Sequence, residues 1–481
     1  ALFDIKVNGA KTKLVIFRTP NSKVPLPTEL KRKVWNYDGV EVKVVEEEKY
    51  LGVMMHGSKD PCYTAEHRAE CGSKALHGML YKCVEVGIYR PDIVCGLFDK
   101  LVRPVLSYGA QIWGPWMFAK YGCKKDTLMR QNATEKVQTD FLRQISGMPK
   151  FVQKMSLYRE FGRQPLMVQW LVLAARWWNK LTSKEEGSIG LATWQENVEL
   201  MLLQKGKKPI WSSLFLKAMH KIGVLKEAVW LQGEMSALQL MQLHFKEDEV
   251  REAAASFLFT SKWEPTRGMD PRTSLSTCVT RATYDQWVAG ADTWEGAQHM
   301  KHYMPLPLRR RLLAFRLGCH RLDIQGLRMQ AVTIPRHERK CRVCGCGEVE
   351  DIMHFVMECG HYAHIRARHD NIFSTCMAQG EDKAHTLRLI FDHKHQMDLA
   401  SCLQDMWRER ERILERQQQQ QQSIEVELEL DHEDCEYSGY VDMFDSDTES
   451  ECGSYTDDDG SELIEVLDSE FSSLGFTVEA F

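Results

Sequence analysis

Residues 341–359 read CRVCGCGEVEDIMHFVMEC, and this short stretch decides the local fold more strongly than any other part of the chain. Cys341, Cys344, His354 and Cys359 follow one another with the spacing C-x2-C-x9-H-x4-C. Two thiolates on a tight turn, followed by an imidazole and a thiolate on a helix, supply the tetrahedral donor set that Zn²⁺ prefers. We therefore expect a structural Zn²⁺ site that is closed by its four ligands and does no chemistry.

Two other side chains compete for a place in this set. Cys346 and His361 lie within two residues of expected ligands, although Cys346 would have to close a loop of a single residue. A further alternative is that the four residues are unrelated, reduced side chains. Asp351 should cap the helix that carries His354, because a carboxylate there accepts the free amides of the first turn. Zinc would supply folding energy to a stretch with little apolar core.

Basic side chains crowd around the same stretch. They are Arg309, Arg310, Arg311, Arg316, Arg321, Arg336, Arg339, Lys340 and Arg342. Such crowding favours contacts with phosphate groups, which give affinity without sequence discrimination. For any single arginine the alternative is a solvated helix face. Taken together, they predict RNA, DNA or both as the partner.

The composition limits the class of protein. A chain of 481 residues with 43% hydrophobic content can bury large cores and should hold two or three domains. No apolar run approaches the ~20 residues of a membrane span, so no membrane partner is expected. The 15 cysteines are scattered outside the cluster and no secretory segment opens the chain, which favours the nucleus, the cytoplasm or both. Because Ala1 lies in what reads as a strand, we interpret the chain as a fragment.

The net charge of −5 conceals two opposite parts. Residues 423–481 contain 20 Asp and Glu but no Lys or Arg, which leaves 62 basic against 47 acidic residues in 1–422, a net charge of +15. The basic body favours a polyanionic partner, and the acidic tail either binds a basic protein or serves only solubility.

Alternating apolar residues near the beginning predict a small β-sheet. Residues 13–17 read as a buried strand, and Asp38-Gly39 separates residues 34–37 from another alternating run. An Asp-Gly pair between such runs is a strong hairpin signal, because both turn positions favour positive φ. A further short strand is expected over residues 49–53.

From Cys62 onward the apolar spacing is helical. The first helix should bury Ala65, Ala69 and Leu76 on one face. A second should begin at Pro91 and run to about Trp113, with its apolar face formed by Ile93, Leu97, Leu101 and Leu106.

Residues 126–182 are expected to form helices with two apolar stripes. The first contains Val137, Phe141, Leu142 and Ile145, and the second Trp170, Leu173, Ala174, Trp177 and Trp178. Aromatic residues at this spacing favour a core position, the alternative for the tryptophans being base stacking. Helices are also expected within residues 183–304 and over 384–416, and the last is followed by a glutamine tract at 417–422.

Several short motifs, in order along the chain, resemble non-LTR (LINE-type) retrotransposon reverse transcriptases. The palm-edge motifs are residues 7–13 leading to Phe17 and residues 49–53; the thumb motifs are 97–109 and 112–114; the post-thumb motifs are 135–138, 141–143 and 147–149. Near the cysteines the matching residues are 315–322, 334–336, Glu350, Asp351, His354, Cys359, Tyr362 and Arg366. The resemblance covers about residues 1–180 and 305–370.

The resemblance implies roles for the matching segments. Lys49, Tyr50, Leu51 and Gly52 correspond to the family's primer grip, although Gly52 is equally well an ordinary hairpin glycine. The family's catalytic aspartates precede the matched palm segment, so we expect no catalytic residue and no Mg²⁺ site in this chain. The run Asp457-Asp458-Asp459 is no substitute, because two-metal catalysis needs carboxylates held around ions ~3.5–4 Å apart.

We therefore expect a mainly α fold with a small N-terminal antiparallel β-sheet, in an elongated multi-domain molecule with a disordered acidic tail. The expected divisions are a palm remnant with a primer-grip-like hairpin at 1–57, a helical thumb at 58–125, post-thumb helices at 126–182, a helical connector at 183–304, a basic CCHC zinc-knuckle region with C-terminal helices at 305–416, and a polyglutamine and acidic tail at 417–481. The expected function is the C-terminal part of a LINE-type reverse transcriptase that binds template RNA or target DNA without being an enzyme by itself. The alternative is a repurposed zinc-containing adaptor whose acidic tail binds a partner.

Overall fold

The computed structural model describes residues 8, 11–18, 25–37, 39–122, 132–150, 152, 154–205, 209–226, 236–259, 296–326 and 334–433. Part of the palm motif at 7–13, Asp38 of the expected turn, much of the expected connector and the acidic segment beyond 433 lie outside these residues.

Two small sheets form the N-terminal part. Strand β3 (Val40–Val45) pairs antiparallel with β2 (Trp35–Tyr37) and parallel with β1 (Lys13–Val15), and the short helix α1 (Thr28–Arg32) precedes β2. The register Asn36↔Glu41 is that of the hairpin predicted from the alternating pattern. The sheet region is therefore rich in antiparallel pairs, with one parallel pair that the sequence did not predict.

The strand expected at 49–53 is instead the tip of a second hairpin. Strands β4 (Glu47–Tyr50) and β5 (Val53–His56) pair antiparallel on either side of Leu51 and Gly52. Both tip residues have positive φ, 47° and 82°, which is the backbone twist that a two-residue hairpin requires. The prediction of one strand was wrong because it did not recognise Leu51 as a turn residue.

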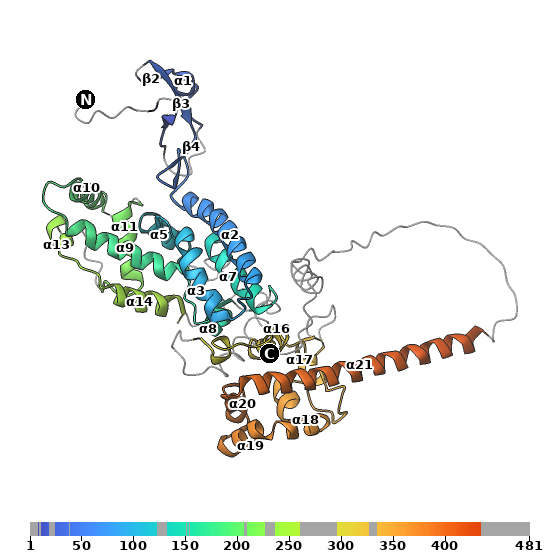
Figure 1. Ribbon diagram of the computed structural model, residues 1–481. Helices are drawn as coiled ribbons and strands as arrows, with labels where there is room; N and C mark the ends of the chain where they lie inside the picture. The colour runs from blue at the N-terminus through green and yellow to red at the C-terminus, as the bar shows by residue number, and fades with distance from the viewer. Residues whose placement is uncertain are drawn as a thin grey trace, which may run out of the picture. The chain divides into compact units, whose positions relative to one another are not determined.

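Helices then build a large apolar core. Its helices are α2 (Cys62–Glu85), α3 (Pro91–Leu101), α4 (Arg103–Leu106), α5 (Ala110–Met117), α7 (Ala133–Ser146), α8 (Lys154–Glu160), α9 (Leu166–Thr182), α10 (Ile189–Leu203), α11 (Trp211–Lys221), α13 (Ala237–Met241) and α14 (Glu247–Phe259). Helix α5 continues into a π-helical turn, η2 (Phe118–Gly122). In Figure 1, α14 lies along α9 and α7 lies beside α2. The segments expected as thumb, post-thumb and connector thus share one core.

The predicted inner face of α2 is confirmed, because Ala65, Ala69 and Leu76 are buried. The helix packs closely on α4 through Gly72, where an added Cβ would lie 2.1 Å from Leu106 Cδ2. A larger residue at this position would force the two helices apart.

The helix expected from Pro91 to Trp113 is divided into three. Pro104 cannot donate the amide hydrogen bond that a continuous helix needs, and Gly109 adopts a φ of +75° between α4 and α5. The predicted apolar face was also wrong in part, since Ile93 and Leu101 are exposed. Val94, Cys95, Phe98 and Val102 are buried in their place.

The tryptophan stripe on α9 forms part of the core, as predicted for Trp170 and Trp178, which are fully buried. Trp170 packs edge-on against Trp113 at a ring separation of 4.7 Å, and Trp178 packs edge-on against Trp194 at 5.3 Å. Trp177 is only half-buried. The two buried rings therefore have no face free for a nucleic-acid base.

A second apolar cluster contains the cysteine stretch. Its helices are α16 (Leu306–Arg316), α17 (Asp323–Gly326), α18 (Ala363–Arg368), α19 (Asp370–Gln379), α20 (Lys383–Phe391) and α21 (Gln396–Glu433), with short turns η4 (Arg336–Glu338), η5 (His354–Glu358) and η6 (Gly360–Tyr362) between them. The short turn η3 (Gln298–Met300) precedes α16, and its Met300 belongs to the first core. Figure 1 shows α21 as a long helix with α18, α19 and α20 along its first part.

The C-terminal helix extends further than predicted. It was expected to end at residue 416, but α21 continues through the glutamine tract to Glu433. Glutamine and glutamate have good helix propensity and no Gly or Pro interrupts the run, which explains the extension.

The predicted fold class, mainly α with a small, antiparallel-rich sheet region, is confirmed. None of the described helices combines the length and apolar character needed to cross a bilayer.

Candidate metal centre

A narrow two-armed loop carries the first pair of candidate ligands. Lys340 pairs with Val349 in an antiparallel bridge, and the Cys341 amide donates to the Glu348 carbonyl at 2.8 Å. These bonds close the arms around residues 342–347. The loop thereby presents Cys341 and Cys344 on one compact turn.

A capped π-helical turn carries the second pair. The Asp351 carboxylate accepts from the His354 amide at 3.0 Å, which confirms the predicted cap. The turn η5 follows, and the Cys359 amide donates to the His354 carbonyl at 2.7 Å. Because a π-helix repeats through i→i+5 hydrogen bonds, the x4 spacing places His354 and Cys359 one turn apart. Arg366 Nη2 also donates to the Cys359 carbonyl, at 2.7 Å.

The four predicted ligands meet. Donor atoms of Cys341, Cys344, His354 and Cys359 all lie within 4.8 Å of one another. Donors around tetrahedral Zn²⁺ with bonds of ~2.3 Å lie ~3.8 Å apart, so three sulfurs and one imidazole nitrogen at this spacing fit zinc. Cys341, His354 and Cys359 are buried and Cys344 is partly buried. The cluster can hold a metal compatible with zinc.

The thiols interact strongly with one another. The hydrogen bond between Cys341 and Cys359 raises the pKa of Cys341 to about 12 and lowers the pKa of Cys359. Cys341 is therefore the donor in this pair and Cys359 the acceptor. A metal ion requires the thiolate form of every cysteine ligand, so its binding would release protons.

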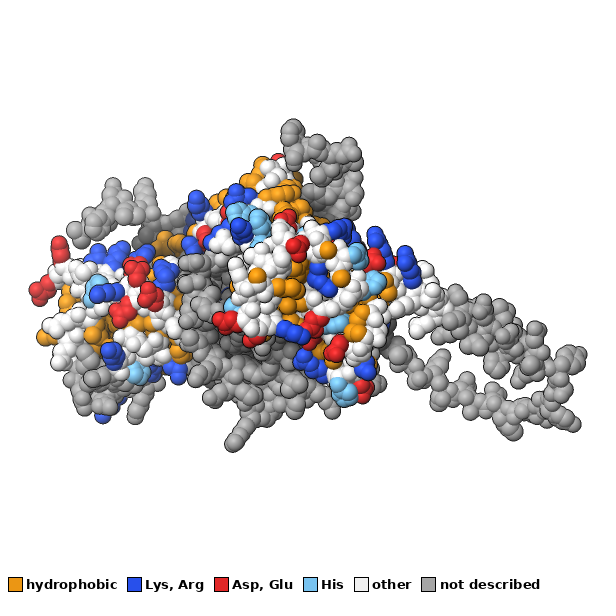
Figure 2. Space-filling model, turned by 90° about the horizontal axis from the view of Figure 1, so that it is seen from below, with side chains coloured by type: hydrophobic (Ala, Val, Ile, Leu, Met, Phe, Trp, Pro, Cys, Tyr) orange, Lys and Arg blue, Asp and Glu red, His pale blue; other side chains and the backbone are white. Residues whose placement is uncertain are grey.

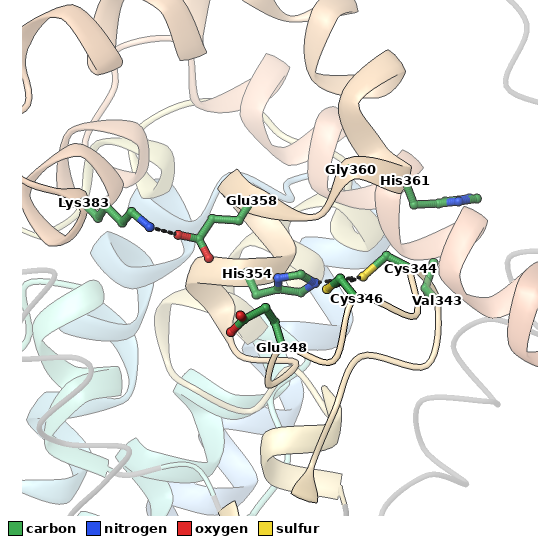
Figure 3. Close-up of a pocket in the computed structure, with 9 residues that line it drawn as sticks. All are labelled: Val343, Cys344, Cys346, Glu348, His354, Glu358, Gly360, His361 and Lys383. Atoms are coloured by element: carbon green, nitrogen blue, oxygen red, sulfur yellow. Dashed lines mark hydrogen bonds and ion pairs between the residues drawn. The ribbon is translucent and has the colours of Figure 1, made fainter. Parts of the chain in front are cut away.

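The two rival ligands lie outside the four-residue group. Cys346 is exposed, and its Sγ lies 3.0 Å from Cys344 Sγ. Figure 3 shows the His354 ring turned toward the sulfurs of Cys344 and Cys346, whereas the His361 ring points away. His361 Nε2 instead lies 3.6 Å from Glu409 Oε1 on α21.

A buried ion cluster connects this loop to α21. Arg410 is 5% exposed and forms ion pairs with Glu350 at 2.6 Å and with Asp323 at 3.2 Å. The Asp323 amide donates to Glu350 Oε2 at 2.7 Å, and Arg342 pairs with Asp323 at 2.6 Å. The buried carboxylates are thus neutralised by arginines from two different segments.

The buried position of Arg410 was not predicted, although the sequence contains a signal for it. Arg410 follows Leu403, Met406 and Trp407 at helical spacing, and all three are buried. A charged residue within an apolar stripe lies on the buried face of its helix and therefore needs a partner of opposite charge.

Three of the nine predicted phosphate contacts lie inside the protein. Arg309 donates to the Met304 carbonyl at 2.8 Å, Arg316 forms an ion pair with Glu160 at 2.9 Å, and Arg339 donates to the Ile324 carbonyl at 2.7 Å. All three arginines are less than 9% exposed. This corrects the expectation for these residues, since a nucleic-acid phosphate cannot reach them.

Two more arginines are half-buried and make intramolecular contacts. Arg310 Nε donates to the Gly147 carbonyl at 3.3 Å, and the Arg311 guanidinium lies 4.1 Å from the centre of the Trp407 ring. The exposed members of the set are Arg321, Arg336, Lys340 and Arg342. In the face seen in Figure 2, Lys and Arg side chains are interspersed with acidic and hydrophobic ones.

The primer-grip-like residues lie on the β4–β5 hairpin. Tyr50 and Leu51 are exposed by 61% and 74% at its tip. The Leu51 carbonyl accepts from Tyr108 Oη at 2.8 Å, and an added Cβ on Gly52 would lie 3.0 Å from the same ring. Tyr108 of the same chain therefore packs closely against Gly52, and a role of this hairpin in holding a primer stays a prediction.

Comparison of the chain with protein-family models, curated proteins and solved structures gives no match.

Proposed function

We propose that this chain is the C-terminal part of a LINE-type reverse transcriptase, in which the thumb and a structural zinc knuckle hold RNA or DNA. The observation that carries the proposal is the meeting of Cys341, Cys344, His354 and Cys359 within 4.8 Å. Their spacing, and the ordered motifs that precede them, match that family's C-terminal pattern. All four coordination positions of a Zn²⁺ ion bound here would be filled by protein side chains, as in structural zinc sites.

Nucleic-acid binding is proposed for the exposed cations beside this centre. Arg336, Lys340 and Arg342 lie on or next to the ligand-bearing loop, and Arg321 follows α16. Arg336 and Arg342 also pair with Asp351 and Asp323, so each guanidinium is held near the loop. Exposed cations on a rigid support are suited to contact a phosphate backbone without reading bases.

We also propose that this chain alone incorporates no nucleotides. In the family, the aspartates that bind two Mg²⁺ ions precede the palm segment that residues 7–17 resemble. The chain would therefore contribute to copying by holding the template or target, while an upstream palm performs the chemistry.

Salt-dependent binding to a homopolymeric RNA and a duplex DNA tests the binding proposal. A triple variant, Arg321→Gln with Arg336→Gln and Lys340→Gln, should weaken binding to both probes and lower the slope of log K against log salt by roughly 0.7–0.9 per lost phosphate contact. The matched control replaces Lys180, Lys184 and Lys221, three exposed lysines far from the loop in sequence, by Gln. Equal loss in both triple variants would contradict a localised binding surface.

Primer extension tests the second part of the proposal. The purified chain should extend no primer on an RNA template with either Mg²⁺ or Mn²⁺. Extension above a no-protein control would contradict the assignment of catalysis to another segment.

A further inference from the structure

A fourth thiol, that of Cys346, lies against the candidate metal centre, whose own ligands are three thiols and one imidazole. Cys346 is exposed and its Sγ lies 3.0 Å from the Sγ of Cys344. Gly345 stands between them with a φ of +64°, a left-handed backbone conformation that bends the chain here. Two sulfurs are therefore held side by side although only one belongs to the four-ligand group.

The four candidate ligands and the adjacent Cys346 differ in their access to solvent. Cys344 and Cys346 line an open surface pocket together with Glu348, Glu358 and Lys383 (Figure 3). Cys341 and Cys359 are only 4% and 0% exposed. A small reagent in solvent therefore reaches the Cys344–Cys346 pair first.

We propose that Cys344 and Cys346 form an oxidation site, at which a peroxide converts the two thiols to a disulfide and detaches Cys344 from the metal. This inference rests on the proposed zinc centre and adds a chemical reaction to it. A disulfide joins Cα atoms ~4.4–6.8 Å apart, a separation that residues i and i+2 on a bent backbone satisfy. The sulfurs must approach by only ~1 Å, because a disulfide bond is ~2.05 Å long.

The reaction balances with hydrogen peroxide as the oxidant. The Cys346 thiolate attacks one peroxide oxygen, an S–O bond forms, the O–O bond breaks, and hydroxide leaves and takes a proton to become water. The Cys344 sulfur then attacks the sulfenic sulfur of Cys346, the S–S bond forms and the S–O bond breaks with loss of a second hydroxide. Two sulfurs lose two electrons in total, and the metal loses one thiolate ligand.

Exposure makes Cys346 the residue on which this reaction depends. Without the Cys346 thiol, Cys344 would be a metal-bound thiolate whose only neighbouring cysteines in the cluster are the two buried ligands, Cys341 and Cys359. With Cys346 present, oxidation ends in a disulfide that a dithiol reductant reverses, after which the four original ligands are again available.

The test uses the full chain, purified under reducing conditions and then freed of reductant. Its zinc content is measured first, and a small molar excess of hydrogen peroxide is then added. Zinc release is followed with a chromogenic chelator, and the disulfide is located by mass spectrometry of unreduced peptides. We expect zinc release to coincide with a linkage between Cys344 and Cys346, and dithiothreitol with added zinc to restore the starting metal content.

The variant Cys346→Ser retains all four proposed ligands and should release zinc roughly tenfold more slowly, because no exposed thiol adjoins the site. Cys71→Ser is the matched control, since Cys71 is a partly buried thiol on α2, outside the four-ligand group, and should behave as the unmodified chain. Release from Cys346→Ser at the unmodified rate, or a disulfide that joins Cys341 or Cys359 instead, would overturn the inference. Absence of zinc before peroxide is added would overturn the zinc centre as well, so the two failures can be told apart.

Discussion

Arg410 donates to both carboxylate oxygens of Glu350, from Nε at 2.7 Å and from Nη2 at 2.6 Å. Arg410 lies on α21 and Glu350 follows the loop that carries Cys341 and Cys344, so this bidentate pair connects the loop to the long helix. Glu350 is 1% exposed, so its carboxylate is shielded from solvent and depends on Arg410 for compensating charge. The loop is therefore held in two ways, by its candidate metal ligands and by a buried ion cluster.

Replacing Arg410 should destabilise the protein strongly. Arg410→Met leaves Glu350 and Asp323 buried with less compensating charge, a change that costs about 3–5 kcal/mol in comparable buried pairs. The free energy of unfolding in urea measures the effect. The control Arg412→Met, at a guanidinium that is 65% exposed and paired with Glu409, should cost less than about 1 kcal/mol. If the two variants are equally stable, the pair does not fasten the loop.

Metal binding should depend on the four ligands and on neither rival. Cys359→Ser is expected to abolish stoichiometric zinc, because its sulfur is one of the four donors, and a strong chelator should lower the Tm of the unmodified chain. His361→Ala and Cys346→Ser should retain full zinc content under reducing conditions. Atomic emission measures all four samples, and loss of zinc from either rival variant would assign a different ligand set.

Acid should weaken the contact between α8 and α16. Burial alone would raise the pKa of Glu160, but the Arg316 guanidinium and the His299 ring, whose Nε2 lies 3.2 Å from Glu160 Oε2, lower this pKa to about 2, below its ordinary value of 4.5. The carboxylate form therefore favours the folded state, and its contribution is present above pH 4.5 and lost as the pH falls toward 2. In Glu160→Gln, the free energy of unfolding should be lower at pH 6 and should decrease less between pH 5 and 3 than in the unmodified chain. If the free energy of unfolding decreases equally between pH 5 and 3 in both proteins, Glu160 is not the group that causes the acid sensitivity.

A second buried carboxyl group, that of Glu135, should make the protein less stable as the pH rises. Burial raises the pKa of Glu135 to about 7, although the Met167 amide donates to its Oε1 at 3.1 Å and the Tyr158 hydroxyl donates to its Oε2 at 3.0 Å. The neutral acid favours folding, so this contribution is full below pH 4.5 and is lost as the pH rises to about 7, by on the order of 3 kcal/mol.

Glu135→Gln should remove that decline, because a neutral amide cannot ionise. Unfolding in urea at pH 5, 6, 7 and 8 gives the comparison, with Glu196→Gln, an exposed carboxyl on α10, as the control. A decline that persists in Glu135→Gln would assign it to another residue.

The β4–β5 hairpin should loosen when its contact with Tyr108 is removed. Tyr108→Phe deletes the hydroxyl that donates to the Leu51 carbonyl while it keeps the ring that faces Arg68, so the cost should be about 1 kcal/mol. Hydrogen exchange of amides 47–56 should become faster in this variant, with Tyr81→Phe on α2 as the control. Equal protection in both variants would mean that the tip is held by other contacts.

Features whose partners lie close together along the chain could be predicted from the sequence. The four candidate ligands fall within 19 consecutive positions, the Asp351 carboxylate accepts from an amide three residues away, and only two residues separate β2 from β3. The wrong predictions at 49–53 and 91–113 arose because Leu51 and Pro104 override the apolar pattern of their own segments.

The amino-acid sequence by itself determined the helical class, the hairpin at Trp35 to Val45 and the spacing that allows four soft ligands to meet, because each depends on local backbone geometry. Only the tertiary structure decided which charges are buried. Arg316 pairs with Glu160 across 156 positions and Arg410 with Glu350 across 60, and the exposure of Cys346 beside Cys344 depends on how the loop folds. The physical reason is that burial of a charge depends on partners brought from distant segments, which the pattern of one segment does not contain.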